Sequence, residues 1–121
     1  MDSEELKDRT KSFAKRILRV VEALPDTITG RAIANQLVRS GASVAANYRA
    51  ACRGRSKAEF ASKIGIVVEE ADESALWLEL IIEDNIFPKG DLSSLLAEAY
   101  EVMSIMITSR KTAMSHLKRG S

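Results

Sequence analysis

Five basic residues in the middle of the chain have a spacing that could follow a phosphate backbone. Arg39, Arg49 and Arg53 fall on one helical stripe, and Arg55 and Lys57 continue it past residue 54. Guanidinium and ammonium groups bind phosphates and release the counterions that surround a nucleic acid. This stripe is therefore the candidate nucleic-acid-binding set: Arg39, Arg49, Arg53, Arg55 and Lys57.

A second basic series precedes it, with Lys7, Lys11 and Lys15 at intervals of four residues. The competing interpretation is that the basic residues form ion pairs with acids within the subunit or across an interface. No aromatic residue interleaves the basic ones, so the sequence predicts no stacking platform for bases. The candidate partners for such ion pairs are Glu69, Glu70, Asp72, Glu73 and Glu79.

Basic and acidic residues are segregated along the chain, although the net charge does not show it. The 121-residue chain has 18 basic and 17 acidic residues and a net charge of +1. Residues 31–63 contain seven basic residues and one acid, whereas residues 69–101 contain ten acids and one base. A protein that binds polyanions through a large overall positive charge is excluded. A local basic patch remains compatible with the composition.

The acidic run has a catalytic interpretation as well. Glu69, Glu70 and Glu73 fit the EExxE motif of all-α nucleotide pyrophosphohydrolases of the MazG type, in which carboxylates hold Mg²⁺. Glu98 and Glu101 give ExxE where those enzymes have ExxD, so the terminal aspartate is missing. A salt-bridged or solvated face explains the same residues more simply.

The remaining chemistry is sparse. A single cysteine, Cys52, excludes an intramolecular disulfide and multi-cysteine metal sites. The single histidine, His116, excludes a di-iron bundle, which needs two Glu-x-x-His motifs. We therefore expect no catalytic residues, metal, cofactor or small-molecule substrate.

These side chains must be positioned by helices, because apolar residues recur every three or four positions and strand-like alternation is absent. The predicted helices cover 3–24, 31–52, a segment from the Ser56 capping box to about Asn85, and a segment capped by Asp91. Three short connections make successive helices antiparallel neighbours. The prediction is one all-α domain, 1–121, folded as an antiparallel up-down-up-down four-helix bundle.

The third helix carries more apolar surface than one bundle buries. Its segment ALWLELII contains one polar residue; Leu78 and Ile82 are placed in the core stripe, with Ile81 at its border. Leu76, Trp77 and Leu80 then point away and are the candidate interface of a homo-oligomer, with the apolar residues around 103–107 of the fourth helix as a second candidate. The alternative is that Trp77 only covers the rim of the bundle. On the second helix, Asn47 is expected at a polar helix–helix seam that fixes register or oligomer state.

A longer pattern carries a family resemblance. Residues 36–80 read QLVRSGASVAANYRAACRGRSKAEFASKIGIVVEEADESALWLEL. The segment resembles the four-helix-bundle family first recognised in intervening sequences of bacterial 23S rRNA genes, and the rest of the chain matches it loosely. Ala50, Gly54 and Val68 depart from the pattern, which often has Glu, Ala and Lys there. The matched family elements are QL at 36–37, RS at 39–40, SV at 43–44, ANYR at 46–49, Arg53, RS at 55–56, EF at 59–60, Lys63, EADE at 70–73 and WL at 77–78.

The resemblance implies an antiparallel four-helix bundle that assembles into a ring-like homopentamer without catalytic activity. A similar accessory protein of diversity-generating retroelements is pentameric and binds nucleic acid through a basic surface. Carried over, that role falls on Arg39, Arg49, Arg53, Arg55 and Lys57.

We therefore expect a non-enzymatic, homo-oligomeric nucleic-acid-binding accessory protein; the alternatives are a protein–protein scaffold and the pyrophosphohydrolase. The first residues, MDSEELKDRTK, contain no apolar segment of the kind a secretory signal has, and apolar runs do not exceed four residues. A cytoplasmic location and no membrane association are expected.

Overall fold

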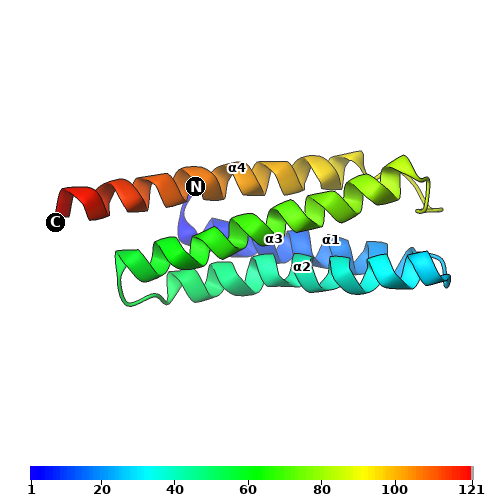
Figure 1. Cartoon of the computed structure of the whole chain (residues 1–121), viewed down its shortest axis with the longest axis horizontal. Coiled ribbons are helices and arrows are strands. Elements are labelled where there is room, and N and C mark those ends of the chain that lie inside the picture. Colours follow the sequence, from blue (N-terminus) through cyan, green and yellow to red (C-terminus); the bar gives the residue numbers. More distant parts are fainter. Residues whose placement is uncertain (121) are drawn as a thin grey trace.

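Four helices make up almost the whole chain. The computed structural model describes residues 1–120, with side chains as far as Lys118. The helices are α1 (Ser3–Ala23), α2 (Ile28–Cys52), α3 (Lys57–Glu83) and α4 (Ser93–Gly120). The chain reverses direction at each connection (Figure 1), so the predicted up-down-up-down bundle is confirmed.

The helix starts follow local capping chemistry. Asp2 accepts a hydrogen bond from the backbone N–H of Glu5 at 2.9 Å, and Ser56 accepts one from Glu59 at 3.1 Å. In a capping box the Glu59 carboxylate would also accept from the backbone N–H of Ser56. It accepts instead from the backbone N–H of Arg55, one residue earlier. Thr27 caps α2 by accepting from Gly30, which explains why this helix begins three residues earlier than predicted.

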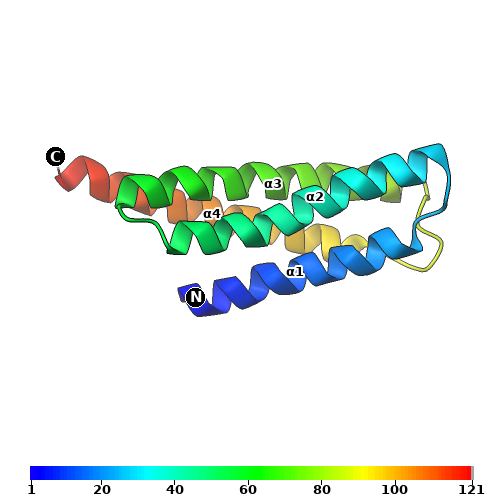
Figure 2. The ribbon, with the colours of Figure 1, turned by 90° about the horizontal axis from the view of Figure 1, so that it is seen from below.

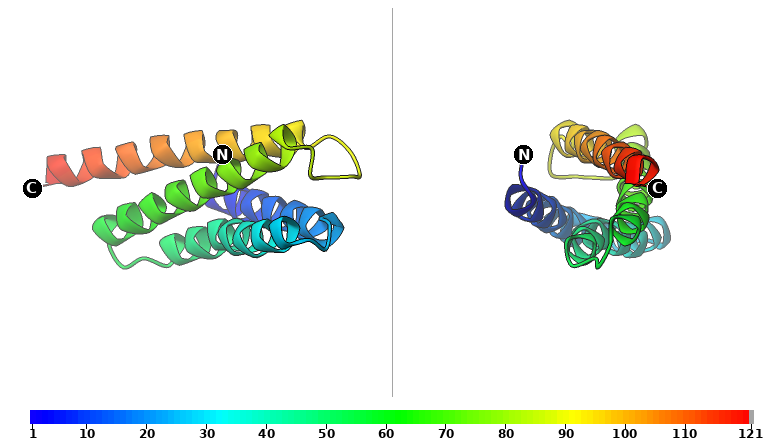
Figure 3. Two further views of the ribbon diagram at one scale, coloured as in Figure 1. Left: turned by 45° about the vertical axis from the view of Figure 1, so that its right-hand side comes forward. Right: turned by 90° about the vertical axis from the view of Figure 1, so that its left-hand side faces the viewer.

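Successive helices are neighbours around a single core. Viewed along the bundle, the order around the core is α1, α2, α3, α4 (Figure 3), and α1 packs mainly on α2, with its smallest contact to α4. No helix within residues 1–120 combines the length and the apolar character that crossing a bilayer requires.

The core side chains follow the predicted stripes, with one reversal. Phe13 and Ile17 of α1, Leu37 and Val44 of α2 and Leu78 of α3 are essentially inaccessible to solvent. The prediction that Ile82 lies in the core and Ile81 at its border was wrong, because Ile81 is fully buried and Ile82 is half-buried. A helix that is apolar on several sides does not reveal from its sequence which stripe faces inward.

Two details set the spacing of the helices. Gly41 lies against Ile17, so that a Cβ there would be 2.4 Å from its Cδ1 atom, and α1 consequently lies close to α2. On the other side of α2, the buried hydroxyls of Ser40 and Ser74 are 2.9 Å apart and join α2 to α3. Ser74 also lies within hydrogen-bond distance of the Glu70 carbonyl oxygen, and Ser40 donates to the Leu37 carbonyl.

Candidate nucleic-acid interface

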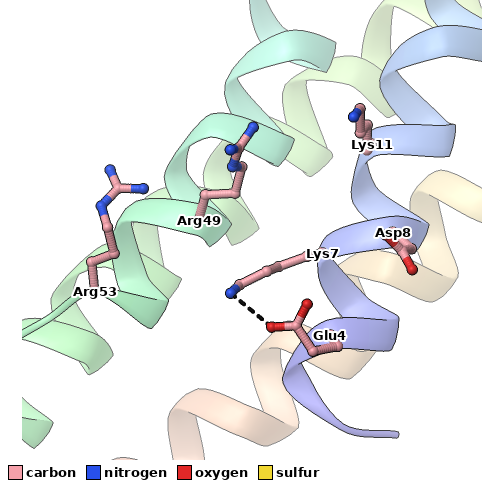
Figure 4. Close-up of a pocket in the computed structure, with 6 residues that line it drawn as sticks. All are labelled: Glu4, Lys7, Asp8, Lys11, Arg49 and Arg53. Carbon is pink, nitrogen blue, oxygen red and sulfur yellow. Dashed lines mark hydrogen bonds and ion pairs between the residues drawn. The ribbon is translucent and has the colours of Figure 1, made fainter.

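Two of the predicted arginines line a cleft between α1 and α2. Arg49 projects from the last turn of α2 and Arg53 directly follows that helix, while Lys7 and Lys11 project from the first half of α1 (Figure 4). The cleft has a volume of about 340 Å³. We call it the α1–α2 cleft, and its lining residues are Glu4, Lys7, Asp8, Lys11, Arg49 and Arg53.

Positive charge exceeds negative charge in this cleft, with four basic residues against two acids. Lys7 is paired with Glu4 of its own helix at 3.0 Å. Lys11, Arg49 and Arg53 form no hydrogen bond or ion pair through their side chains with any residue whose side chain the structure describes. Three cations therefore remain available for an external anion.

Arg39 has a different environment. Its guanidinium group donates to Glu70 at 2.9 Å and to Glu73 at 2.5 Å, both on α3. The pKa of Glu73 is lowered, chiefly by the hydrogen bond from Arg39 and despite partial desolvation. The competing interpretation of the arginines, pairing within the subunit, therefore describes Arg39, which the structure does not bring into the α1–α2 cleft.

Arg55 and Lys57 lie beyond the cleft, at the turn between α2 and α3 and at the first residue of α3. Both side chains are exposed, and neither forms a bond with another described side chain. The turn therefore extends the positive surface around this end of the bundle.

Arg9 forms a charged contact that the sequence did not single out. It donates to both oxygens of Glu98 at 2.8 Å and lies 3.1 Å from Glu101, so it joins α1 to α4. The pKa of Glu98 is lowered, chiefly by hydrogen bonding from Arg9, while burial opposes the shift. The sequence shows only that α1 contains an arginine at this position. The partner of Arg9 depends on how the helices pack, so the sequence does not predict it.

These ion pairs also account for four of the five carboxylates of the pyrophosphohydrolase alternative, all but Glu69. Glu70 and Glu73 bind Arg39, while Glu98 and Glu101 bind Arg9. Among the described side chains, no group of three or more Asp, Glu, His or Cys is arranged to hold a metal ion.

The candidate oligomer surface lies on the outward side of α3. Leu76 is 47% exposed and Leu80 is 38% exposed, whereas Trp77 is half-buried against the core. The Trp77 indole N–H is 3.4 Å from a Glu73 carboxylate oxygen, beside the Arg39 ion pair. A single chain thus leaves two of the three predicted interface side chains partly open to solvent.

Asn47 is hydrogen-bonded inside its own helix. Its side-chain amide donates to the Ser43 carbonyl at 3.0 Å and lies 2.8 Å from the Ser43 hydroxyl. The polar contact that crosses from α2 to α3 is made by Ser40 and Ser74. Within one chain, the polar seam between α2 and α3 is therefore formed by the two serines, and a role of Asn47 in an oligomer stays a prediction.

Similarity to known proteins agrees with this geometry. The family model for 23S rRNA-intervening sequence proteins matches residues 4–108. The chain belongs to this family. A crystal structure of a protein of unknown function from the S23 ribosomal protein family of Bacteroides thetaiotaomicron VPI-5482 superposes with a TM-score of 0.82. The two sequences are 31% identical, and the match covers 92% of this chain and 99% of the crystallised chain. No curated protein sequence matches. The predicted family membership is confirmed.

Proposed function

We propose that this 23S rRNA-intervening sequence protein is a non-enzymatic, oligomeric accessory protein of the cytoplasm that binds the phosphate backbone of RNA or DNA. The binding surface is the α1–α2 cleft together with the α2–α3 turn. The main phosphate-binding residues of this surface are Arg49 and Arg53, assisted by Lys11, Arg55 and Lys57.

The unneutralised charge of Arg49 and Arg53 carries this proposal. Arg39 lies on the same helix, and each of its two terminal guanidinium nitrogens is bonded to a carboxylate. The guanidinium groups of Arg49 and Arg53 line an open cleft and have no partner among the described side chains. A guanidinium group that is already paired gains little from a phosphate, whereas an unpaired one can form charge-assisted bonds and release counterions.

The oligomer is the second part of the proposal. Leu76 and Leu80 form an exposed apolar surface that another copy of the chain would cover. Repetition of the cleft around an assembly, which the family resemblance suggests is a pentamer, would let one long polyanion contact several clefts and raise the avidity.

Charge reversal in the cleft tests the binding. The affinity for a labelled duplex and for a structured RNA is measured at low and moderate salt, with the wild type and with Arg49→Glu/Arg53→Glu. We expect salt-sensitive binding by the wild type and a loss of about a hundredfold or more in the variant. The matched control, Arg31→Glu/Lys89→Glu, makes the same change in net charge at the opposite end of the bundle and should bind normally.

Absence of binding by the wild type, or undiminished binding by the cleft variant, would contradict the proposal. A cleft variant that falls apart into monomers would instead favour the scaffold alternative, in which these arginines make subunit contacts. The mass of each variant in light scattering separates the two results.

The same measurement tests the oligomer directly. Leu76→Ser/Leu80→Ser should lower the mass, while Ile28→Ser, at a residue that is 82% exposed on α2, should not. A wild-type monomer at micromolar concentration would refute this part of the proposal.

A further inference from the structure

A second groove opens at the same end of the bundle, between the start of α3 and the last third of α4. It has a volume of about 370 Å³. The C-terminal part of α4 extends past the start of α3 and forms one side of the groove (Figure 2). Its lining residues are Lys57, Phe60, Ser109, Thr112, Ala113 and His116.

Phe60 gives this groove an aromatic surface beside positive charge. Its ring is half-buried against the core, so packing restricts its position while part of it remains open to the groove. Lys57 lies three residues before it, and α4 adds His116 with two hydroxyl groups. The sequence alone predicted no stacking platform, because no aromatic residue interleaves the basic residues of the stripe.

A continuous series of cations connects the two hollows. Arg53 follows the last residue of α2 and lines the α1–α2 cleft, Arg55 lies in the turn, and Lys57 lines the α3–α4 groove. A strand whose phosphates follow these residues would therefore pass from the cleft to the groove and bring a base close to Phe60.

We propose that the α3–α4 groove binds an unpaired base of the nucleic acid whose backbone occupies the α1–α2 cleft; this inference rests on the proposed function. The base stacks on Phe60, and the adjoining phosphate contacts Lys57. Ser109 and Thr112 line the groove, and their hydroxyls would form hydrogen bonds with the edge of the base. Thr112 already donates to the Thr108 carbonyl, which leaves its oxygen as an acceptor.

The consequence is a preference for nucleic acid with a single-stranded part. Paired bases in a duplex hide their faces in the stack, whereas unpaired bases can be splayed out onto an aromatic side chain. The α1–α2 cleft supplies affinity for either form, and the α3–α4 groove discriminates between them.

Affinities for two labelled probes test this inference: a blunt duplex, and the same duplex with a single-stranded overhang of six thymidines. We expect the wild type to bind the overhang probe more tightly. Phe60→Leu, which keeps an apolar side chain without an aromatic face, should weaken overhang binding by about tenfold and leave duplex binding unchanged. Phe60→Tyr keeps the ring and should retain the preference.

A matched control is Phe87→Leu, since Phe87 is also half-buried but lies in the connection between α3 and α4 at the far end of the bundle. It should bind both probes like the wild type, and helical content measured by circular dichroism checks the folding of each variant. A second readout is the fluorescence of Phe60→Trp/Trp77→Phe, which the overhang probe should quench and the blunt duplex should not.

Equal affinity of the wild type for both probes, or a Phe60→Leu variant with an undiminished preference, would overturn the inference and leave the proposed function standing. Failure of the wild type to bind either probe would overturn the proposed function, and this inference with it.

Discussion

Two regions of α2 carry the same residue type in opposite electrostatic states. Near its middle, Arg39 is held by Glu70 and Glu73 of α3, and near its end Arg49 and Arg53 have no carboxylate partner. A count of arginines therefore overstates the binding surface. The difference teaches that the register between neighbouring helices decides which basic residues hold the bundle together and which remain available.

The antiparallel packing of α2 and α3 explains the difference. The two helices run in opposite directions (Figure 1), and Ser40 of α2 meets Ser74 of α3, so a residue further along α2 lies opposite an earlier residue of α3. Arg49 then lies at about the level of Gly65 on α3, eight residues before Glu73 and short of the acidic run. The charge segregation of the sequence becomes a positive end of the folded bundle.

The close contact between α1 and α2 positions the α1–α2 cleft, and Gly41→Ala tests this contact. We expect the largest change in stability from this substitution. The new methyl group would collide with Ile17, whose β-branched side chain is buried and cannot turn away. The free energy of unfolding should fall by about 1–3 kcal/mol, as measured by denaturant unfolding.

The control is Gly65→Ala on α3. There the nearest atom is Nε of the exposed Arg110 side chain, 3.2 Å from the added carbon, which can move away. Its stability should be unchanged or higher by up to about 1 kcal/mol. Equal destabilisation by both substitutions would show that the Gly41 contact does not set the spacing of the helices.

Arg9→Met measures how much a paired arginine contributes to the stability of the bundle. Arg9 is 21% exposed and Glu98 is 18% exposed, so removing Arg9 leaves a largely desolvated carboxylate without its donor. At pH 7 the free energy of unfolding should fall by about 1–3 kcal/mol. Lys7→Met, which breaks an exposed pair within α1, should cost no more than about 0.5 kcal/mol.

The same pair predicts a pH dependence. Because hydrogen bonds from Arg9 lower the pKa of Glu98, the pair stabilises the folded protein above the ordinary glutamate pKa of 4.5. This stabilisation should disappear as the pH falls through the lowered pKa. The difference in unfolding free energy between wild type and Arg9→Met should therefore shrink below pH 4.5; a difference that grows on acidification would contradict it.

Arg39→Gln should have a smaller effect on stability than Arg9→Met, although Arg39 contacts two carboxylates. Its side chain is 50% exposed, so solvent screens the ion pairs and their net contribution is below about 1 kcal/mol. Thermal unfolding at low and high salt measures it. A loss of several kcal/mol would mean that the middle of α2 depends on this pair far more than its exposure indicates.

Features that depend on residues close together in the chain could be predicted from the sequence. The cap at Ser56 and the core position of Leu78 follow from spacing alone. The pairing of Arg39 with Glu70 and Glu73 was one of two open interpretations, because the sequence does not give the register between α2 and α3.

Features set by packing between helices were missed for the same reason. The Ser40–Ser74 bridge and the Arg9–Glu98 pair join residues 34 and 89 positions apart, so local periodicity does not indicate them. Phe60 is similar, since its place beside His116 arises only when α4 packs along α3.

The most direct test of the central claim compares single neutralisations of the two kinds of arginine. The affinity of Arg53→Gln and Arg39→Gln for the same duplex DNA is measured over a range of salt concentrations. Arg53→Gln should bind more weakly and lower the slope of log affinity against log salt by about one, because one phosphate contact is lost. Arg39→Gln should bind with the affinity and slope of the wild type. Equal losses in the two variants, or a larger loss in Arg39→Gln, would contradict the claim that the unpaired arginines at the end of α2 form the binding surface.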